Sequence, residues 1–329
     1  MAKILILGAG IAGHTAASHL RRKLSKEHEV VVVSPNRNYQ WVPSNIWVGI
    51  GRMKSDEVFF PLEPLYKRKG IGYKQAKVIS FHPEGDATET KGFVTIEYIF
   101  GKKAGVQEKV NYDYLINATG PKLAFELTEG LNPGTNKAYS VCTYEHAAHA
   151  SEALLKLIGD IKTSDKKAKI LIGTGHAKAT CQGAAFEYIL NVEKELVRYG
   201  VRDKIELTWI SNENELGDFG MDGMLLTYGN QTLKSSELVE MVFADRGIKW
   251  ILGAGVFKID EGKAHYENLE GEYKEEDFDF AMLIPSFSGH GFKAFDKNEN
   301  DITAKLFKGF MIFFFSSRRR HTRCSCDWS

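Results

Sequence analysis

The sequence predicts an α/β protein made of two Rossmann-like, doubly wound domains. Two segments carry the order strand, glycine-rich turn, helix, strand: one opens the chain and one begins near residue 170. Apolar runs without alternation, such as 30–33, are typical of strands buried on both faces of a parallel sheet. The chain has 329 residues, which is enough for two separate hydrophobic cores.

The first domain is expected to combine a βαβ unit with an antiparallel insertion. Its expected elements, in chain order, are a strand (4–7), a helix (15–24), a strand (30–33), a loop-like aromatic stretch (37–52), two antiparallel strands (78–81 and 93–100), a strand ending in a glycine turn (113–120) and an amphipathic helix (146–158). A polar, charged stretch at 163–167 then indicates a linker.

A second βαβ unit follows this linker. Its expected elements are strands at 170–172, 205–210, 248–252 and 279–284, and helices at 184–199 and 235–246. We therefore predict a first nucleotide-binding domain that begins at 1–160, a second Rossmann-like domain at 161–285, a return to the first at 286–311, and a tail at 312–329.

The composition argues against several classes of protein. The formal net charge is +1 with both signs mixed, so we expect no nucleic-acid partner. Lys3 enters a strand almost at once, so we expect no signal peptide and a cytoplasmic location. No apolar run approaches the ~18 residues of a membrane-spanning helix. Four cysteines do not make a secreted disulfide scaffold, which leaves catalysis, metal binding or packing for them.

A glycine fingerprint follows the first strand. Its residues are Gly8, Ala9, Gly10, Ile11, Ala12 and Gly13. In this pattern the first glycine permits a tight turn, the second lets a pyrophosphate approach the backbone, and the third lets the helix pack closely on the strand. The pyrophosphate would bind free N–H groups at the start of the helix, so we predict a dinucleotide site here.

The rest of the first domain favours FAD over NAD at this site. The second strand ends in Ser34, where the fingerprint usually has an acid that binds a ribose hydroxyl, and this departure alone does not identify the cofactor. However, a strand that ends in Ala118-Thr119-Gly120 resembles the second flavin-binding signature of flavoproteins with two dinucleotide domains.

The second fingerprint is incomplete and is followed by a cysteine. Gly173 and Gly175 match its first two glycines, but Lys178 stands where the third should be, which weakens the case for bound NAD(P)H. Cys181 follows at an expected helix start, where the helix dipole favours a thiolate. A buried apolar role is the alternative for an isolated cysteine, but Cys142, near an expected flavin-facing segment, favours redox chemistry.

Taken together, these motifs resemble the sulfide:quinone oxidoreductases, within the FAD-dependent pyridine nucleotide-disulfide oxidoreductase superfamily, whose architecture is glutathione-reductase-like. The resemblance runs from Lys3 to about Lys308. It rests on 41–49 (Trp-Val-Pro-Ser-Asn-Ile-Trp-Val-Gly), 118–126 (Ala-Thr-Gly-Pro-Lys-Leu-Ala-Phe-Glu), 140–147 (Ser-Val-Cys-Thr-Tyr-Glu-His-Ala) and 181–187 (Cys-Gln-Gly-Ala-Ala-Phe-Glu). The last two segments resemble the first and second redox-cysteine motifs of that family.

The resemblance implies an enzyme that oxidises sulfide to polysulfide or sulfur and passes electrons through FAD, covalently or noncovalently held, to a membrane quinone. It implies that Cys181 is a sulfur-bridging cysteine, that Cys142 is an auxiliary sulfur-handling cysteine, and that Glu187 and His146 handle protons. Taken singly, Glu187 is better interpreted as a solvated carboxylate and His146 as a helix-capping or core histidine.

The resemblance also implies cofactor contacts and a location. Beyond the first fingerprint, the implied contacts are Ser34, Asn45, Val78, Ala118, Thr119, Gly120 and Gly289. It implies peripheral attachment to the inner membrane and leaves a homo-oligomer open. We expect no metal.

The sequence departs from the family pattern in two places. Asp218 stands where a histidine is often found. Near Phe310 the chain leaves the pattern, before a third cysteine, the last flavin-binding motif, most of the quinone pocket and the amphipathic membrane anchors. The tail resembles translated sequencing-adapter read-through, which we favour over a basic nucleic-acid patch or a metal site of His321, Cys324 and Cys326. We therefore expect a truncated enzyme, whose activity as a fragment is left open.

Three other functions remain open. An NADH:quinone oxidoreductase of the same fold would need an intact second fingerprint and no redox cysteines. The flavin subunit of a flavocytochrome sulfide dehydrogenase would usually be exported. A noncatalytic FAD-binding protein would hold flavin without turnover.

Overall fold

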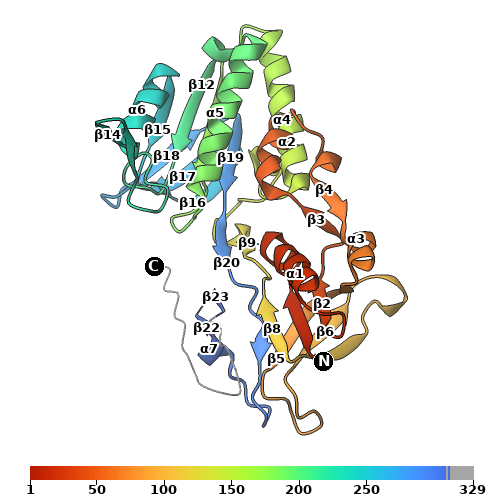
Figure 1. The fold of residues 1–329 in the computed structure, drawn as a ribbon. Coiled ribbons are helices and arrows are strands. Elements are labelled where there is room, and N and C mark those ends of the chain that lie inside the picture. The colour runs from red at the N-terminus through yellow and green to blue at the C-terminus, as the bar shows by residue number, and fades with distance from the viewer. Residues whose placement is uncertain (309, 312–329) are drawn as a thin grey trace. The chain divides into compact units, whose positions relative to one another are not determined.

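The computed structural model describes residues 1–308 and 310–311 and divides into two compact units, each an α/β domain (Figure 1). Unit 1 comprises residues 1–40, 60–122 and the segment from 288 onward, and unit 2 comprises residues 41–59 and 123–287. The expected α/β class with Rossmann-type domains is confirmed.

Unit 1 is built on a sheet with the strand order β7-β6-β5-β2-β1-β8, in which β5, β2, β1 and β8 run parallel and β6 and β7 continue antiparallel. Its elements are β1 (Lys3–Leu7), α1 (Ile11–Lys23), β2 (Glu29–Ser34), β3 (Asn38–Gln40), α3 (Leu62–Lys69), β5 (Gly72–His82), β6 (Phe93–Tyr98), β7 (Gln107–Asn111), β8 (Tyr114–Asn117), β21 (Lys293–Ala294), α7 (Thr303–Leu306), β22 (Phe307–Lys308) and β23 (Phe310–Met311). The predicted antiparallel insertion is therefore present.

The central strands of unit 1 are buried on both faces, as their unbroken apolar sequence predicts. In β1, Ile4 and Ile6 pack in a cluster with Ala17 of α1 and Tyr66 of α3, while the intervening Leu5 contributes to a cluster on the opposite face. Successive side chains of a strand point to opposite faces, so each face of this strand needs its own apolar cover.

Unit 2 is built on a parallel five-stranded sheet with the order β10-β19-β11-β12-β15. Its elements are α2 (Asn45–Gly49), β10 (Ala138–Tyr139), α4 (Tyr144–Lys162), β11 (Ala168–Thr174), α5 (Gln182–Tyr199), β12 (Ile205–Ile210), β13 (Leu225–Tyr228), β14 (Gln231–Lys234), α6 (Ser235–Asp245), β15 (Ile248–Ile251), β16 (Gly255–Asp260), β17 (Lys263–Glu267), β18 (Tyr273–Asp277) and β19 (Phe280–Ile284). Two short ribbons lie where the chain changes unit, β3 with β4 (Phe59–Pro61) and β9 (Lys122–Ala124) with β20 (Ser286–Ser288).

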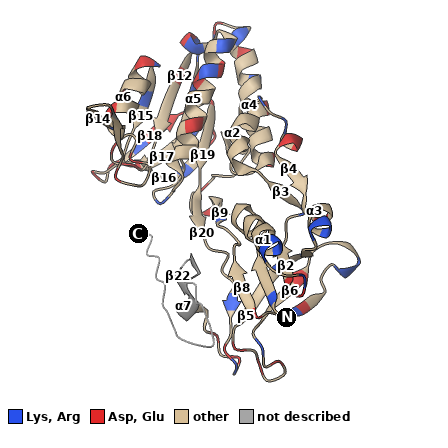
Figure 2. Cartoon of the chain, in the orientation of Figure 1, with Lys and Arg blue, Asp and Glu red and all other residues tan. Residues whose placement is uncertain are grey.

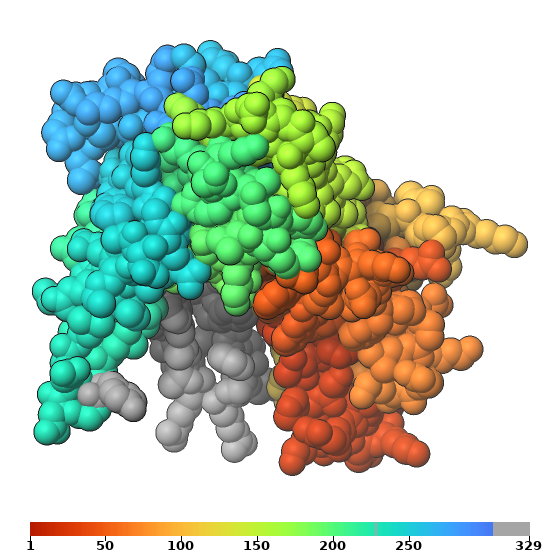
Figure 3. Space-filling view, turned by 90° about the horizontal axis from the view of Figure 1, so that it is seen from above, coloured from red at the N-terminus to blue at the C-terminus, as the bar shows by residue number. Residues whose placement is uncertain are grey.

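Two layers cover the sheet of unit 2. On one face, α4 and α5 pack side by side, as the yellow-green and green segments of Figure 3 show. On the other face, the antiparallel sheet β16-β17-β18 contributes Val256 and Ile259 to a second cluster. Basic and acidic positions are interspersed along the chain (Figure 2). Among the described residues, no helix has the length and apolar character needed to cross a membrane.

The units differ from the predicted boundaries. Residues 41–59 and 123–160 group with unit 2, because Ile46 of α2 and Leu154 of α4 belong to the same buried cluster as Ile189 of α5. The aromatic stretch expected as a loop at 37–52 also contains the short helix α2. This regrouping places both the 41–49 segment and the two predicted redox cysteines in unit 2. The predicted tail at 312–329, with His321, Cys324 and Cys326, lies outside the described residues.

Candidate functional site

The first fingerprint forms a tight turn between β1 and α1 in unit 1. Gly8 has φ +95°, and a Cβ there would lie 2.1 Å from the carbonyl oxygen of Ala118 at the end of β8. A Cβ on Gly13 would lie 2.1 Å from the carbonyl oxygen of Gly8. These close approaches explain why two of the three glycines are required by packing alone.

The middle glycine of this fingerprint has a different role. Gly10 is the N-cap of α1 and is exposed, and a Cβ there would meet no atom within 4 Å. Ile11 and Ala12, the first residues of the helix, are exposed as well. The first turn of a helix has N–H groups without intrahelical partners and a positive dipole end. The residues 8–13 therefore fit the pyrophosphate of a dinucleotide such as FAD.

The turn after β8 lies against the same fingerprint. Asn117 accepts hydrogen bonds at its Oδ1 from the N–H and the hydroxyl of Thr119, at 3.2 and 2.8 Å. Gly120 has φ +72°, and a Cβ there would meet nothing within 4 Å. His290 forms a hydrogen bond with the Thr119 backbone, and the assignment of the adjoining Gly289 to the cofactor remains a prediction.

Two other predicted cofactor contacts in unit 1 are less open. Ser34 is 1% exposed, and its hydroxyl accepts a hydrogen bond from the N–H of Asn36 at 3.2 Å. Val78 lies on β5 at an irregularity in the β5–β6 register and is half-buried against an apolar cluster. Their assignment to the cofactor remains a prediction.

Asn45, a further predicted cofactor contact, lies in unit 2. Its side chain is 1% exposed, and its Nδ2 donates to the carbonyl oxygen of Val141 at 3.0 Å. Val141 directly precedes Cys142. The described contact of Asn45 therefore holds the backbone beside a predicted redox cysteine, a positioning role that the sequence did not indicate.

The second fingerprint, in unit 2, differs from the first. The helix α5 begins at Gln182 and not directly after Gly175. A Cβ on Gly175 would lie 2.7 Å from Cδ2 of Leu131 and 3.1 Å from Cβ of Leu283, so apolar side chains occupy the approach that is open at Gly10. The second fingerprint therefore departs from the pattern twice. Lys178 stands in place of its third glycine, and its turn lacks the geometry of a pyrophosphate site.

The acid after β12 is buried and hydrogen-bonded within unit 2. Nucleotide-binding domains often use an acid at the end of the second strand to bind a ribose hydroxyl. Here Glu213 is 4% exposed and accepts hydrogen bonds from the hydroxyl of Ser211 and from the N–H of Phe219. Burial raises the pKa of its carboxyl group. Its place after the second strand of a βαβ unit could have drawn attention to it in the sequence.

The two predicted redox cysteines lie near one another in unit 2. Cys142 follows β10, and its N–H donates to Oγ of Ser140 at 3.1 Å. Cys181 is the exposed N-cap of α5, with φ +75°, which confirms its predicted position at a helix start. Both are free thiols. Burial, and to a smaller extent the nearby Cys181 thiol, raise the pKa of the Cys142 thiol to about 11.

The predicted proton-handling residues have unequal surroundings. His146 lies in the first turn of α4, where its N–H donates to the capping Oγ1 of Thr143 at 3.2 Å. Its Nδ1 is buried and has no hydrogen-bond partner in the described part of the chain. Burial lowers the pKa of His146 below 6.5, so the imidazole is neutral at neutral pH. Glu187 is exposed on α5.

The segment 41–49 supports both cysteine segments from one side. The hydroxyl of Tyr188, on α5, donates to the carbonyl oxygen of Gly49 at 3.0 Å. A Cβ on Gly49 would lie 2.8 Å from Cγ1 of Val141 and 2.9 Å from Cε2 of Tyr188. Tyr188 is fully buried, and the sequence did not single it out.

A chain with a glycine fingerprint that fits a dinucleotide in one unit and two thiols in the other has the combination expected of a flavin-dependent disulfide reductase fold. The family model of pyridine nucleotide-disulphide oxidoreductases matches residues 2–185. The chain belongs to this family. Membership places it among FAD-binding oxidoreductases.

Three relatives make the comparison finer. The sulfide-quinone reductase of Aquifex aeolicus is 31% identical over 290 residues, and its crystal structure superimposes with a TM-score of 0.74. The mitochondrial sulfide:quinone oxidoreductase of Dictyostelium discoideum is 25% identical over 298 residues. A type II NADH:quinone oxidoreductase of Staphylococcus aureus is 22% identical over 215 residues.

These matches cover unequal shares of the chain and of its relatives. The first two relatives each match 88% of this chain, which confirms the resemblance noted from the motifs, and the third matches 63%. The matched regions make up 60%, 57% and 48% of the respective relatives. The chain thus spans less than two thirds of their length.

Proposed function

We propose that the protein to which this chain belongs oxidises sulfide with FAD and passes the electrons to a membrane quinone. The observation that carries the proposal is that Cys142 and Cys181, from separate segments, lie in one unit and near enough for Cys181 to influence the pKa of Cys142. The similarity to two sulfide:quinone oxidoreductases supports the same substrate class.

The exposed position of Cys181 suits a role as the leaving group in thiol–disulfide exchange. Hydrosulfide attacks an oxidised sulfur bridge that includes the Cys181 sulfur; a new S–S bond forms to the attacked sulfur, the bridge bond breaks, and Cys181 leaves as a thiolate. The N-terminus of α5 stabilises that negative charge. Bound FAD supplies the acceptor for the two electrons that are then passed to the quinone.

The high pKa of the Cys142 thiol gives this cysteine a different role from that of Cys181. At neutral pH this thiol keeps its proton, so it forms a sulfur–sulfur bond only when a base removes that proton. We assign that base to His146, whose imidazole is neutral at this pH and whose buried Nδ1 has no hydrogen-bond partner among the described residues. Glu187, exposed on the neighbouring helix, would exchange protons with water.

The second unit argues against NADH as the electron donor. Leu131 occupies the approach at Gly175, and the carboxylate of Glu213 is engaged by Ser211 and Phe219. Unit 2 therefore lacks both the open turn that would bind the pyrophosphate of NADH and the free carboxylate that would bind its ribose. Attachment to the cytoplasmic side of the inner membrane belongs to the same proposal and rests on the family resemblance.

The experiment compares sulfide with NADH as reductants of bound flavin. The FAD-loaded protein with the complete reading frame is mixed anaerobically with each, and flavin absorbance is followed. We expect bleaching by sulfide but not by NADH, and loss of the sulfide reaction in Cys181→Ser. Cys181→Ala should behave in the same way, while Thr180→Ser, the exposed neighbour, serves as the control. Undiminished bleaching by sulfide in both Cys181 variants would remove this cysteine from the mechanism.

A further inference from the structure

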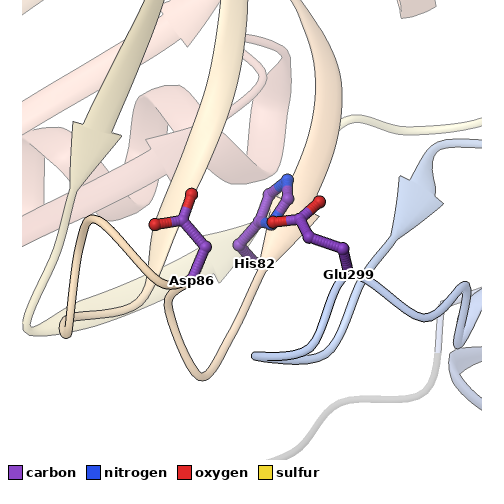
Figure 4. A group of neighbouring side chains, drawn as sticks. All are labelled: His82, Asp86 and Glu299. Carbon is purple, nitrogen blue, oxygen red and sulfur yellow. The ribbon is translucent and has the colours of Figure 1, made fainter.

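A cluster of three side chains in unit 1 lies outside the thiol site and the fingerprint. His82 is the last residue of β5, Asp86 lies in the turn that follows, and Glu299 lies beyond β21 (Figure 4). One donor atom from each of the three lies within 4.8 Å of the others. Because β21 pairs in parallel with β5 next to His82, these segments from distant parts of the sequence are held together by backbone hydrogen bonds.

The imidazole of His82 is held in one orientation. Its ring is stacked between Phe93, at 4.3 Å and 11°, and Phe295, at 5.3 Å and 26°. The residue is 7% exposed, and its Nε2 lies 3.2 Å from the buried hydroxyl of Ser80. When Nε2–H donates to this hydroxyl, Nδ1 carries the lone pair. Metal-binding histidines commonly have such a second hydrogen bond, which sets tautomer and direction.

The other nitrogen of His82 faces the two carboxylates. Nδ1 is buried and has no hydrogen-bond partner in the described part of the chain. The nearest carboxylate oxygen, Oε1 of Glu299, lies 3.7 Å away, which is too long for a hydrogen bond. A buried polar nitrogen without a partner is costly, so a ligand that fills this position gains by satisfying it.

Asp86 is fixed and ionised. Its Oδ1 accepts three hydrogen bonds of 2.8 Å, two from Thr88 and one from the N–H of Glu89. Its Oδ2 accepts one of 2.6 Å from Nζ of Lys109, and this bond holds the pKa of the carboxyl group well below its usual range. An ion entering the cluster would share Oδ2 with Lys109 or displace it, and the 48% exposure of the Lys109 side chain leaves it room to move.

We propose that His82, Asp86 and Glu299 bind a divalent first-row transition-metal ion, for which Zn²⁺ is the probe. One imidazole nitrogen and two carboxylate oxygens form a ligand set that suits Zn²⁺, whereas Mg²⁺ and Ca²⁺ prefer oxygen ligands alone. Zinc–ligand bonds of ~2.0–2.2 Å need donor atoms closer together than the present spacing. The side chain of Glu299, 58% exposed, supplies that movement.

The ion would tie the returning segment to the β5–β6 hairpin. This segment also carries Gly289 and His290, and His290 binds the Thr119 turn of the candidate flavin site. An ion that binds the folded state and not the unfolded chain stabilises the fold in proportion to its affinity and concentration. The site is thus a structural clip of unit 1, independent of sulfide chemistry.

The test is a Zn²⁺ titration by isothermal calorimetry of the full chain with all four cysteines changed to serine, which removes thiolate binding. We expect one Zn²⁺ per chain, much weaker Mg²⁺ binding, and a rise in the thermal midpoint with Zn²⁺. Glu299→Gln should weaken Zn²⁺ binding by at least about tenfold and reduce that rise accordingly.

The controls are Glu84→Gln, an exposed acid in the same turn as Asp86, and His19→Gln, an exposed histidine on α1. Both should bind Zn²⁺ as the parent does. His82→Gln should also lose binding, and Glu299→Gln keeps the test decisive if the buried substitution unfolds the unit. Equal affinity in the parent and in Glu299→Gln, or the absence of a one-to-one Zn²⁺ site in the parent, would overturn the proposal.

Discussion

Gly10 and Gly175 occupy the same position in the two fingerprints, and substituting alanine at each should have opposite effects. Gly10 has φ −73° and ψ −166°, which alanine can adopt, and its Cβ would meet no protein atom within 4 Å. The free energy of unfolding of Gly10→Ala should therefore change by less than about 0.5 kcal/mol. The new methyl group would instead stand where a pyrophosphate approaches the helix N-terminus.

The expected cost to FAD binding in Gly10→Ala follows from one lost charge-assisted hydrogen bond. Such a bond contributes ~1.5–3 kcal/mol, so the dissociation constant should rise by about 10- to 150-fold. The measurement is FAD titration of apoprotein, followed by the quenching of flavin fluorescence. An unchanged dissociation constant, or a large loss of stability, would refute the assignment of Gly10 to the pyrophosphate.

Gly175→Ala is the matched comparison. Its Cβ would lie 2.7 Å from Cδ2 of Leu131, and relieving this overlap in a packed core costs ~1–3 kcal/mol. Urea unfolding should show this loss, while the affinity for FAD remains that of the parent. If Gly175→Ala instead leaves stability intact and alters nucleotide binding, the second turn is open and the argument against NADH fails.

Three further predictions concern the thiol site of unit 2. Iodoacetamide at pH 8 should label Cys181 well before Cys142, because burial raises the pKa of Cys142 to about 11; peptide mass spectrometry gives the order, and equal labelling would contradict it. Tyr188→Phe should lower the free energy of unfolding by ~1–3 kcal/mol, since it leaves the carbonyl of Gly49 without its partner, whereas Tyr114→Phe, 61% exposed, should have little effect in urea. The folded pKa of His146 lies below 6.5, so as the pH falls below about 7 the unfolded chain takes up the proton first and stability declines. His146→Gln should show a shallower decline in urea unfolding between pH 7 and pH 5, and an identical slope would count against a buried neutral imidazole.

Much of the secondary structure could be predicted from local patterns. The strand 205–210 has the predicted bounds, and the helix expected at 184–199 begins only two residues earlier, at Gln182. These elements were predictable because the spacing of apolar residues reflects burial. A parallel strand is buried on both faces and gives an unbroken apolar run, whereas a helix is buried on one face and gives a helical period. The helix α2 was missed, because five residues are too few for a helical period to appear.

The candidate site was predictable only in part. The positions of Gly8, Gly13 and Cys181 at their turns follow from a motif whose local geometry is intrinsic to strand–turn–helix units. The buried amide of Asn45, the carboxyl group of Glu213 and the hydroxyl of Tyr188 acquire their roles from partners far away in the chain or hidden by folding. The spacing of apolar residues along the sequence does not reveal such hydrogen-bond partners.

By itself, the sequence determined that this is an α/β protein with two Rossmann-like domains. It also determined that one glycine fingerprint is intact, that the other is incomplete, and that two cysteines lie in segments that resemble redox-cysteine motifs. Only the tertiary structure decided that Leu131 closes the second turn, that Cys181 lies near Cys142, and that His82 lies close to Asp86 and Glu299. The physical reason is that backbone sterics and apolar periodicity act between near neighbours. A pKa, an occupied cavity or a ligand cluster depends on groups that only the folded chain brings together.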